Sequence, residues 1–126
     1  MERKIELELR MPDNKFRTFT QEFIPFRKRY DYIRLEKDLE KEAAVQERLV
    51  EETEYDQLQI QFVADLFESE EVTKDLILGG LDTADRHKIY EIIRYRVLGF
   101  SQADDEAAKK AMTEEILSGA TSTNSN

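Results

Sequence analysis

Strict alternation of apolar and charged residues near the N-terminus limits the fold more than any other feature of the chain. The apolar positions are Ile5, Leu7, Leu9 and Met11, and a charged residue separates each from the next. This period of two predicts a half-buried strand over about residues 3–11. Turn-forming residues at 12–15 and an aromatic, β-branched run at 16–20 predict a hairpin. Because an isolated hairpin is marginal in water, its Ile/Leu face should dock on helices or extend a sheet with a neighbouring molecule.

After Pro25 the apolar spacing becomes helical. Proline fits the first turn of a helix, and a long charged segment follows it. Its apolar stripe drifts: Phe26, Tyr30 and Ile33 lie on one line, and Tyr32, Leu35 and Leu39 lie one position round. A helix of about 24 residues is roughly twice the mean length, so it either breaks near Lys41 or projects from the body.

Three further segments have helical signatures. Thr53 is a candidate cap for a helix with the stripe Tyr55, Leu58, Phe62 and Leu66. A short helix at 73–78 is expected to stop at Gly79-Gly80, and a last helix opens at Asp82, carries apolar residues from Ile89 to Val97 and ends near Gly99. The predicted fold class is mainly α with an N-terminal β-hairpin (α+β), built as a small helical bundle.

The sequence divides into two regions. Residues 1–100 are predicted to form the hairpin and helical domain. Residues 101–126 are predicted to be weakly helical over 103–117 and then disordered, because the last nine residues carry no apolar side chain beyond Ala120.

Several chemistries lack the residues they need. The chain has no cysteine and a single histidine, His87, so it has no thiol nucleophile, and a zinc site would need carboxylates in place of imidazoles. The run from Asp82 places Ala84 and Arg86 where a calcium loop needs oxygen ligands. No stretch approaches the ~18 apolar residues of a membrane span. We therefore expect a soluble cytosolic protein, and we assign it no catalytic residue, no metal site and no cofactor.

Charge is unevenly distributed along a chain of net charge −9. Residues 1–34 contain nine basic and six acidic residues, a charge of +3, whereas residues 35–126 carry −12. Such a dipole can steer one copy onto the opposite end of another, although segregated signs on a solvated surface explain it equally well. Together with a hairpin face of Ile5, Leu7 and Leu9, it predicts a homo-oligomer.

Two other functions are possible from charged clusters. The acidic runs at 51–56 and 68–71 resemble metal sites, but acids at helix ends are usually solvated. The basic residues Arg27, Lys28, Arg29 and Arg34 suggest an adaptor or regulator that contacts nucleic acid. A patch this short in an acidic chain argues against nucleic acid as the partner.

The order of segments resembles the tail assembly chaperones of long-tailed bacteriophages, especially those that infect Gram-positive bacteria. The resemblance covers about residues 3–99. Its most telling pieces are TFTQEFIP at residues 18–25, before the first helix, and VTKDLILGGLD at residues 72–82, before the last.

This resemblance implies a non-enzymatic protein of the host cell cytoplasm that is not expected in the mature virion. It would bind and solubilise the tape-measure protein and promote assembly of the tail tube around it. In that family a frameshifted longer form recruits the tail-tube protein, and this chain would be the short form. A long helical partner needs an apolar groove, for which the candidates are Tyr55, Phe62, Phe67, Ile92 and Val97, although any small helical core would use the same residues.

Overall fold

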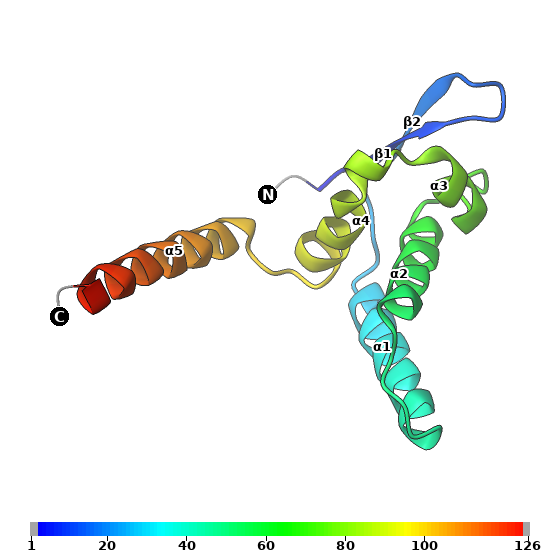
Figure 1. The fold of residues 1–126 in the computed structure, drawn as a ribbon. Coiled ribbons are helices and arrows are strands. Elements are labelled where there is room, and N and C mark those ends of the chain that lie inside the picture. Colours follow the sequence, from blue (N-terminus) through cyan, green and yellow to red (C-terminus); the bar gives the residue numbers. More distant parts are fainter. Residues whose placement is uncertain (1–2, 125–126) are drawn as a thin grey trace.

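The structure is a computed structural model that describes residues 3–124 (Figure 1). A two-stranded hairpin precedes a set of helices, so the predicted mainly α fold with an N-terminal hairpin is confirmed. The elements are β1 (Ile5–Arg10), β2 (Phe16–Gln21), α1 (Arg27–Val45), α2 (Glu52–Leu66), α3 (Lys74–Gly80), the 3₁₀-helix η1 (Thr83–Asp85), α4 (His87–Glu91), the π-helix η2 (Ile92–Val97) and α5 (Gln102–Asn124).

The hairpin is antiparallel and docks one face on the helices. Leu7 lies opposite Phe19 in the register, and the turn is closed by a bond from the Met11 amide to the Lys15 carbonyl at 2.8 Å. Asn14 has a φ of 69°, which asparagine tolerates well. Burial alternates along β1 as the period of two predicts, and β1 packs against α3. Of the two expectations for this face, docking on helices is the one observed.

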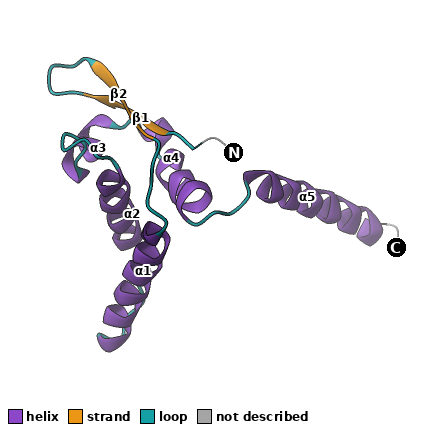
Figure 2. Ribbon diagram, turned by 180° about the vertical axis from the view of Figure 1, so that it is seen from behind, coloured by secondary structure: helices purple, strands orange, loops and turns teal. Residues whose placement is uncertain are grey.

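Helices α1 and α2 form an antiparallel pair that projects from the body (Figures 1 and 2). Helix α1 continues without a break past Lys41 and ends at Val45. Of the two expectations for this long helix, projection from the body is therefore the one observed. Its inward residues are Tyr32 and Ala43. The Tyr32 ring meets the ring of Phe62 edge-on, with centroids 5.0 Å apart, and this contact holds the base of the pair together.

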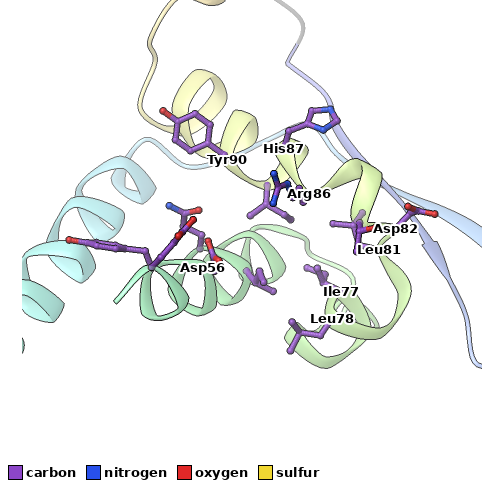
Figure 3. A pocket seen from close by; sticks show the side chains of 14 residues that line it. Asp56, Ile77, Leu78, Leu81, Asp82, Arg86, His87 and Tyr90 are labelled. Carbon is purple, nitrogen blue, oxygen red and sulfur yellow. The ribbon is translucent and has the colours of Figure 1, made fainter. Parts of the chain in front are cut away.

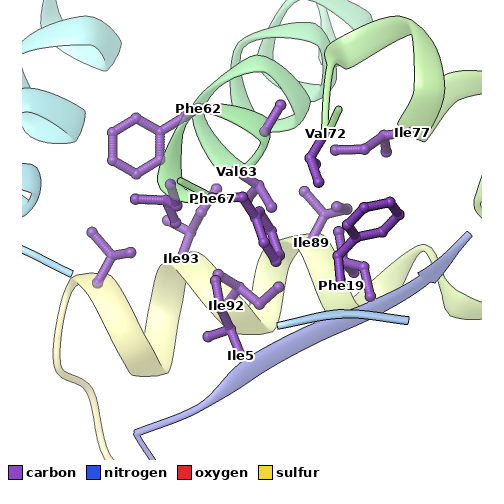
Figure 4. Close-up of a cluster of buried hydrophobic side chains, with 14 of the residues drawn as sticks. Ile5, Phe19, Phe62, Val63, Phe67, Val72, Ile77, Ile89, Ile92 and Ile93 are labelled. Carbon is purple, nitrogen blue, oxygen red and sulfur yellow. The ribbon is translucent and has the colours of Figure 1, made fainter. Parts of the chain in front are cut away.

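The core lies where the hairpin, α2, α3 and the α4–η2 helix meet (Figure 4). Leu7, Leu9 and Val63 are fully buried at its centre. Ile5 on β1 faces Ile92 on the last core helix (Figure 4). The other buried members include Phe19, Phe62, Leu66, Phe67, Val72, Ile77, Ile89, Ile93 and Val97.

Three helix ends can be compared with the sequence-based prediction. The helix predicted over 73–78 includes the Gly79-Gly80 pair and ends at Gly80. Helix α2 is opened by Glu51, not Thr53: the Glu51 amide donates to Glu54 Oε2 at 2.8 Å. The Glu54 side chain thus accepts from the amide of Glu51, the residue before the helix, as in a capping box. Thr53 lies within the first turn and does not cap it. Asp82 caps η1 instead of the last helix itself, through a bond from the Ala84 amide.

The last core helix changes its winding before the chain leaves the body. Residues Ile92–Val97 form a π-helix, and the Leu98 amide bonds to the Ile93 carbonyl five residues back at 2.8 Å. Gly99 then adopts a φ of 82°, which favours glycine and ends the helix close to the predicted position.

Helix α5 follows and extends away from the body (Figures 1 and 2). The structure is helical as far as Asn124, across most of the segment for which we expect a disordered tail. The last two residues of that tail lie outside the described residues. In the part of the chain from 3 to 124, no helix is both long and apolar enough to cross a membrane.

Candidate partner-binding cleft

A cleft of about 630 Å³ lies between α2, α3 and α4 (Figure 3). Each helix supplies part of an apolar floor, and two large side chains at its edge are open to solvent. Leu78 of α3 is 50% exposed and Tyr90 of α4 is 51% exposed. The apolar and aromatic lining residues are Tyr55, Ile60, Ile77, Leu78, Leu81, Ile89 and Tyr90. This composition suits an apolar side chain of another protein.

The rim of the cleft is polar and mostly acidic. Glu52 and Asp56 belong to α2 and Asp82 precedes η1, whereas Arg86 and His87 stand at the start of α4. The rim thus carries three carboxylates and one guanidinium beside the His87 imidazole. The rim therefore favours a ligand that carries basic residues beside its apolar ones.

Tyr55 connects the cleft to the projecting helix pair. Its hydroxyl donates to Glu40 Oε1 of α1 at 3.1 Å. Desolvation and the bond to Glu40 both raise the pKa of Tyr55 above its ordinary value. The phenol therefore stays protonated and keeps donating at physiological pH, which fixes the ring at the edge of the cleft.

A second tyrosine supports the same helix pair from inside. Tyr32 of α1 bonds through its hydroxyl to Glu36, and the amide of Gln59 on α2 donates to that hydroxyl at 3.3 Å. Burial, followed by the bond to Glu36, raises the pKa of Tyr32. The two helices are thus joined by hydrogen bonds at two levels, which sets the position of the α2 wall of the cleft.

The arrangement offers an apolar binding surface with a polar rim. His87 is exposed on α4. Among residues 3–124, no group of three or more histidine, aspartate and glutamate side chains is placed to hold a metal ion. The acidic runs that resemble metal sites lie instead at helix starts and loops, where Glu54 pairs with Arg48 and Glu71 pairs with Arg17.

The structure places most of the predicted groove residues in the core. Phe62, Phe67, Ile92 and Val97 are all less than 9% exposed, and only Tyr55 reaches the cleft. Their assignment to a partner surface stays a prediction. Leu78 and Tyr90 were missed because an apolar residue beside Gly79, or within the apolar stripe of the last helix, looks like core in the sequence.

The hairpin face and part of the basic patch make contacts within the molecule itself. Ile5, Leu7 and Leu9 are at most 5% exposed, because the helices cover them. Their assignment to a self-association surface stays a prediction. In the basic patch, Arg29 Nη1 donates to the Leu98 carbonyl at 2.6 Å, which ties the start of α1 to the end of η2 and removes one cation from the surface.

Comparison with known proteins assigns the class to which this small helical binding domain belongs. A family model described as phage tail chaperone protein matches residues 1–116. The match covers most of the chain, so the protein belongs to this family of phage tail chaperones, which is not known as enzymatic. The family resemblance seen in the sequence is thereby confirmed. No curated protein and no solved structure matches the chain.

Proposed function

We propose that this protein binds the tape-measure protein of its phage and keeps it soluble while the tail tube assembles around it. Membership of the phage tail chaperone family supports this role most directly. A tape-measure protein is a long helical chain with apolar faces, which aggregates unless those faces are covered. We further propose that this phage infects a Gram-positive host.

The cleft between α2, α3 and α4 is the surface we assign to this contact. An amphipathic helix binds by inserting a few apolar side chains at helical spacing into such a depression. Leu78 and Tyr90 stand on opposite sides of the opening and would grip an inserted side chain, while Glu52 and Asp56 meet basic residues beside it. Leu78 and Tyr90 can both be substituted without disrupting the core, because each side chain is about half exposed.

The test is co-expression with a tape-measure fragment. The wild-type protein is expected to raise the soluble yield of the fragment and to co-purify with it. The double variant Leu78→Asp/Tyr90→Asp should lose both effects, because two carboxylates at the opening oppose burial of an apolar side chain. The matched control is Phe16→Asp, which changes a similarly exposed aromatic residue on the hairpin that does not line the cleft.

Two outcomes would contradict this proposal. A fragment that stays insoluble beside the wild-type protein would reject tape-measure binding. Full activity of the Leu78→Asp/Tyr90→Asp variant would keep the function and reject the cleft as its site.

We also propose that a frameshifted longer form recruits the tail-tube protein, and that both forms act in the host cytoplasm and leave before the virion matures. Mass spectrometry of infected cells should then find peptides of this chain continuous with a longer C-terminal sequence. Purified virions should contain neither form. Detection of this chain in mature particles would reject the second part.

A further inference from the structure

Helix α1 leaves one complete face open to solvent. Residues 26, 30, 34, 37 and 41 follow each other at spacings of three and four, so they share one side of the helix. They are Phe26, Tyr30, Arg34, Lys37 and Lys41, and all five are exposed. The two rings touch edge-on with centroids 5.7 Å apart, and Phe26 is 74% exposed. This aromatic-basic face is apolar at its N-terminal end and cationic beyond it.

Helix α5 carries the complementary pattern. Asp104, Ala108, Met112 and Ile116 follow at spacings of four, with Glu115 beside them. Met112 and Ile116 are 62% and 64% exposed. The helix contains five acidic and two basic residues, a charge of −3. This acidic-apolar face carries Asp104 at its N-terminal end and Met112 and Ile116 beyond it, with Glu115 at its edge.

The helix is held where it cannot reach the aromatic-basic face of its own molecule. Arg94 of η2 makes two bonds to the carboxylate of Asp105, at 2.6 and 2.8 Å, and its guanidinium stacks on Phe100 at 4.3 Å from the ring centroid. In Figures 1 and 2, α5 and α1 extend from the body in different directions and do not lie side by side. Its face is therefore presented to another molecule.

We propose that α5 of one copy docks antiparallel on the aromatic-basic face of α1 in a second copy. In that alignment Phe26 meets Met112, the large Tyr30 meets the small Ala108, and Arg34 meets Asp104. A parallel alignment would set Arg34 against Ile116 and leave the charge unpaired. Because each molecule offers one helix and one face, the two surfaces in contact are different and the contact joins copies head to tail.

A mixing experiment tests this contact. The double variant Phe26→Ser/Tyr30→Ser removes the face, and the double variant Met112→Ser/Ile116→Ser removes the helix stripe. Sedimentation velocity should show each variant as a monomer at concentrations where the wild-type protein associates. An equimolar mixture should form a one-to-one dimer and nothing larger, because only one intact face and one intact helix remain to pair.

The control variants change exposed apolar residues elsewhere. Phe16→Ser on the hairpin and Leu49→Ser at the tip of the α1–α2 pair should associate as the wild-type protein does. Exchanging the charges tests the register: Arg34→Glu and Asp104→Arg should each weaken association by about tenfold, and the two together should restore it.

Other results would overturn the proposal. A wild-type protein that stays monomeric at millimolar concentration, or a mixture of the two variants that stays monomeric, would show that the two faces do not pair. Continued association of Phe26→Ser/Tyr30→Ser, with loss of association in Met112→Ser/Ile116→Ser, would instead place α5 in another site. None of these results depends on tape-measure binding, which is measured separately with the tape-measure fragment.

Discussion

Gly80 of α3 lies directly against the backbone of Arg10 at the end of β1. A Cβ atom placed on Gly80 would stand 2.7 Å from the Arg10 carbonyl oxygen and 3.2 Å from its amide nitrogen. Real Cβ atoms do not approach backbone so closely. The absence of a side chain at Gly80 therefore lets the hairpin pack on α3. A Cβ atom placed on the neighbouring Gly79 would have no atom within 4 Å.

Gly80→Ala should destabilise the domain by about 1–3 kcal/mol, since strand and helix must separate to admit the methyl group. Gly79→Ala is the matched control. It should be neutral or stabilising by up to about 1 kcal/mol, because alanine favours the helix and meets open space. Urea unfolding monitored by circular dichroism gives both free energies. Equal effects of the two substitutions would contradict the proposed close approach.

Phe62→Ala should cost about 3–5 kcal/mol, a large part of the ~5–15 kcal/mol that stabilises a small domain. The side chain is 4% exposed and contacts Tyr32, so its removal leaves a cavity beneath the helix pair. Thermal unfolding is the measurement, and Phe26→Ala, at a highly exposed ring of the same type, should change the melting temperature little. A Phe62→Ala protein that melts within a degree or two of the wild type would place Phe62 outside the core.

The orientation of α5 should resist acid. Arg94, followed by Tyr95, holds the pKa of Asp105 down to about 2. A carboxyl group whose pKa is lowered by folding stabilises the folded arrangement above its ordinary pKa near 3.9, and that contribution is lost as the pH falls through the lowered value. The α5 anchor should therefore be intact at pH 4 and released near pH 2.

Pairs of spin labels can measure the orientation of α5. Labels attach to introduced cysteines, and the chain has no cysteine of its own to compete. Labels at Leu49→Cys and Thr113→Cys should give one narrow distance distribution from pH 7 to pH 4. Asp105→Asn should broaden it at every pH, and Asp104→Asn, one residue earlier, should not. An unchanged distribution in Asp105→Asn would show that another contact orients the helix.

Self-association should weaken as salt is added. The charges on the two complementary faces are exposed, and charges of this kind are screened over ~8 Å at physiological ionic strength and over ~3 Å at 1 M. Light scattering should show association weakened by up to about tenfold between low salt and 1 M salt, because one exposed ion pair is screened, with unchanged helical circular dichroism. Association that strengthens with salt would show that Arg34 and Asp104 do not pair.

Local periodicity was sufficient to predict the hairpin and its buried face. Strict alternation at Ile5, Leu7 and Leu9 leaves one register that covers the apolar side. The drifting stripe of α1 was different, because Phe26 and Tyr32 are both aromatic, and the one that turns inward is the one that meets Phe62 on another helix. Phe26 and Tyr30 remain outside, in the aromatic-basic face, and their exposure was not predictable from the sequence.

The cleft was predictable only in part. Tyr55 belongs to a stripe that the sequence identifies, but Leu78 and Tyr90 come from two short helices whose relative placement depends on long-range packing. Gly80 shows the same limit. A glycine pair after an apolar run indicates a helix end, and α3 does end at Gly80, but Gly80 also serves a contact with a strand about 70 residues earlier, which no local signal records.

The π-helix between Ile92 and Val97 has a consequence for the direction of α5. A π-turn holds about one more residue than an α-turn, so η2 behaves as a one-residue insertion that the last core helix has absorbed. Each residue of an α-helix turns the chain by about 100°. Deleting a single residue from this segment would restore α-winding, rotate Gly99 and the start of α5 around the helix axis, and point α5 in a new direction while leaving its own sequence intact.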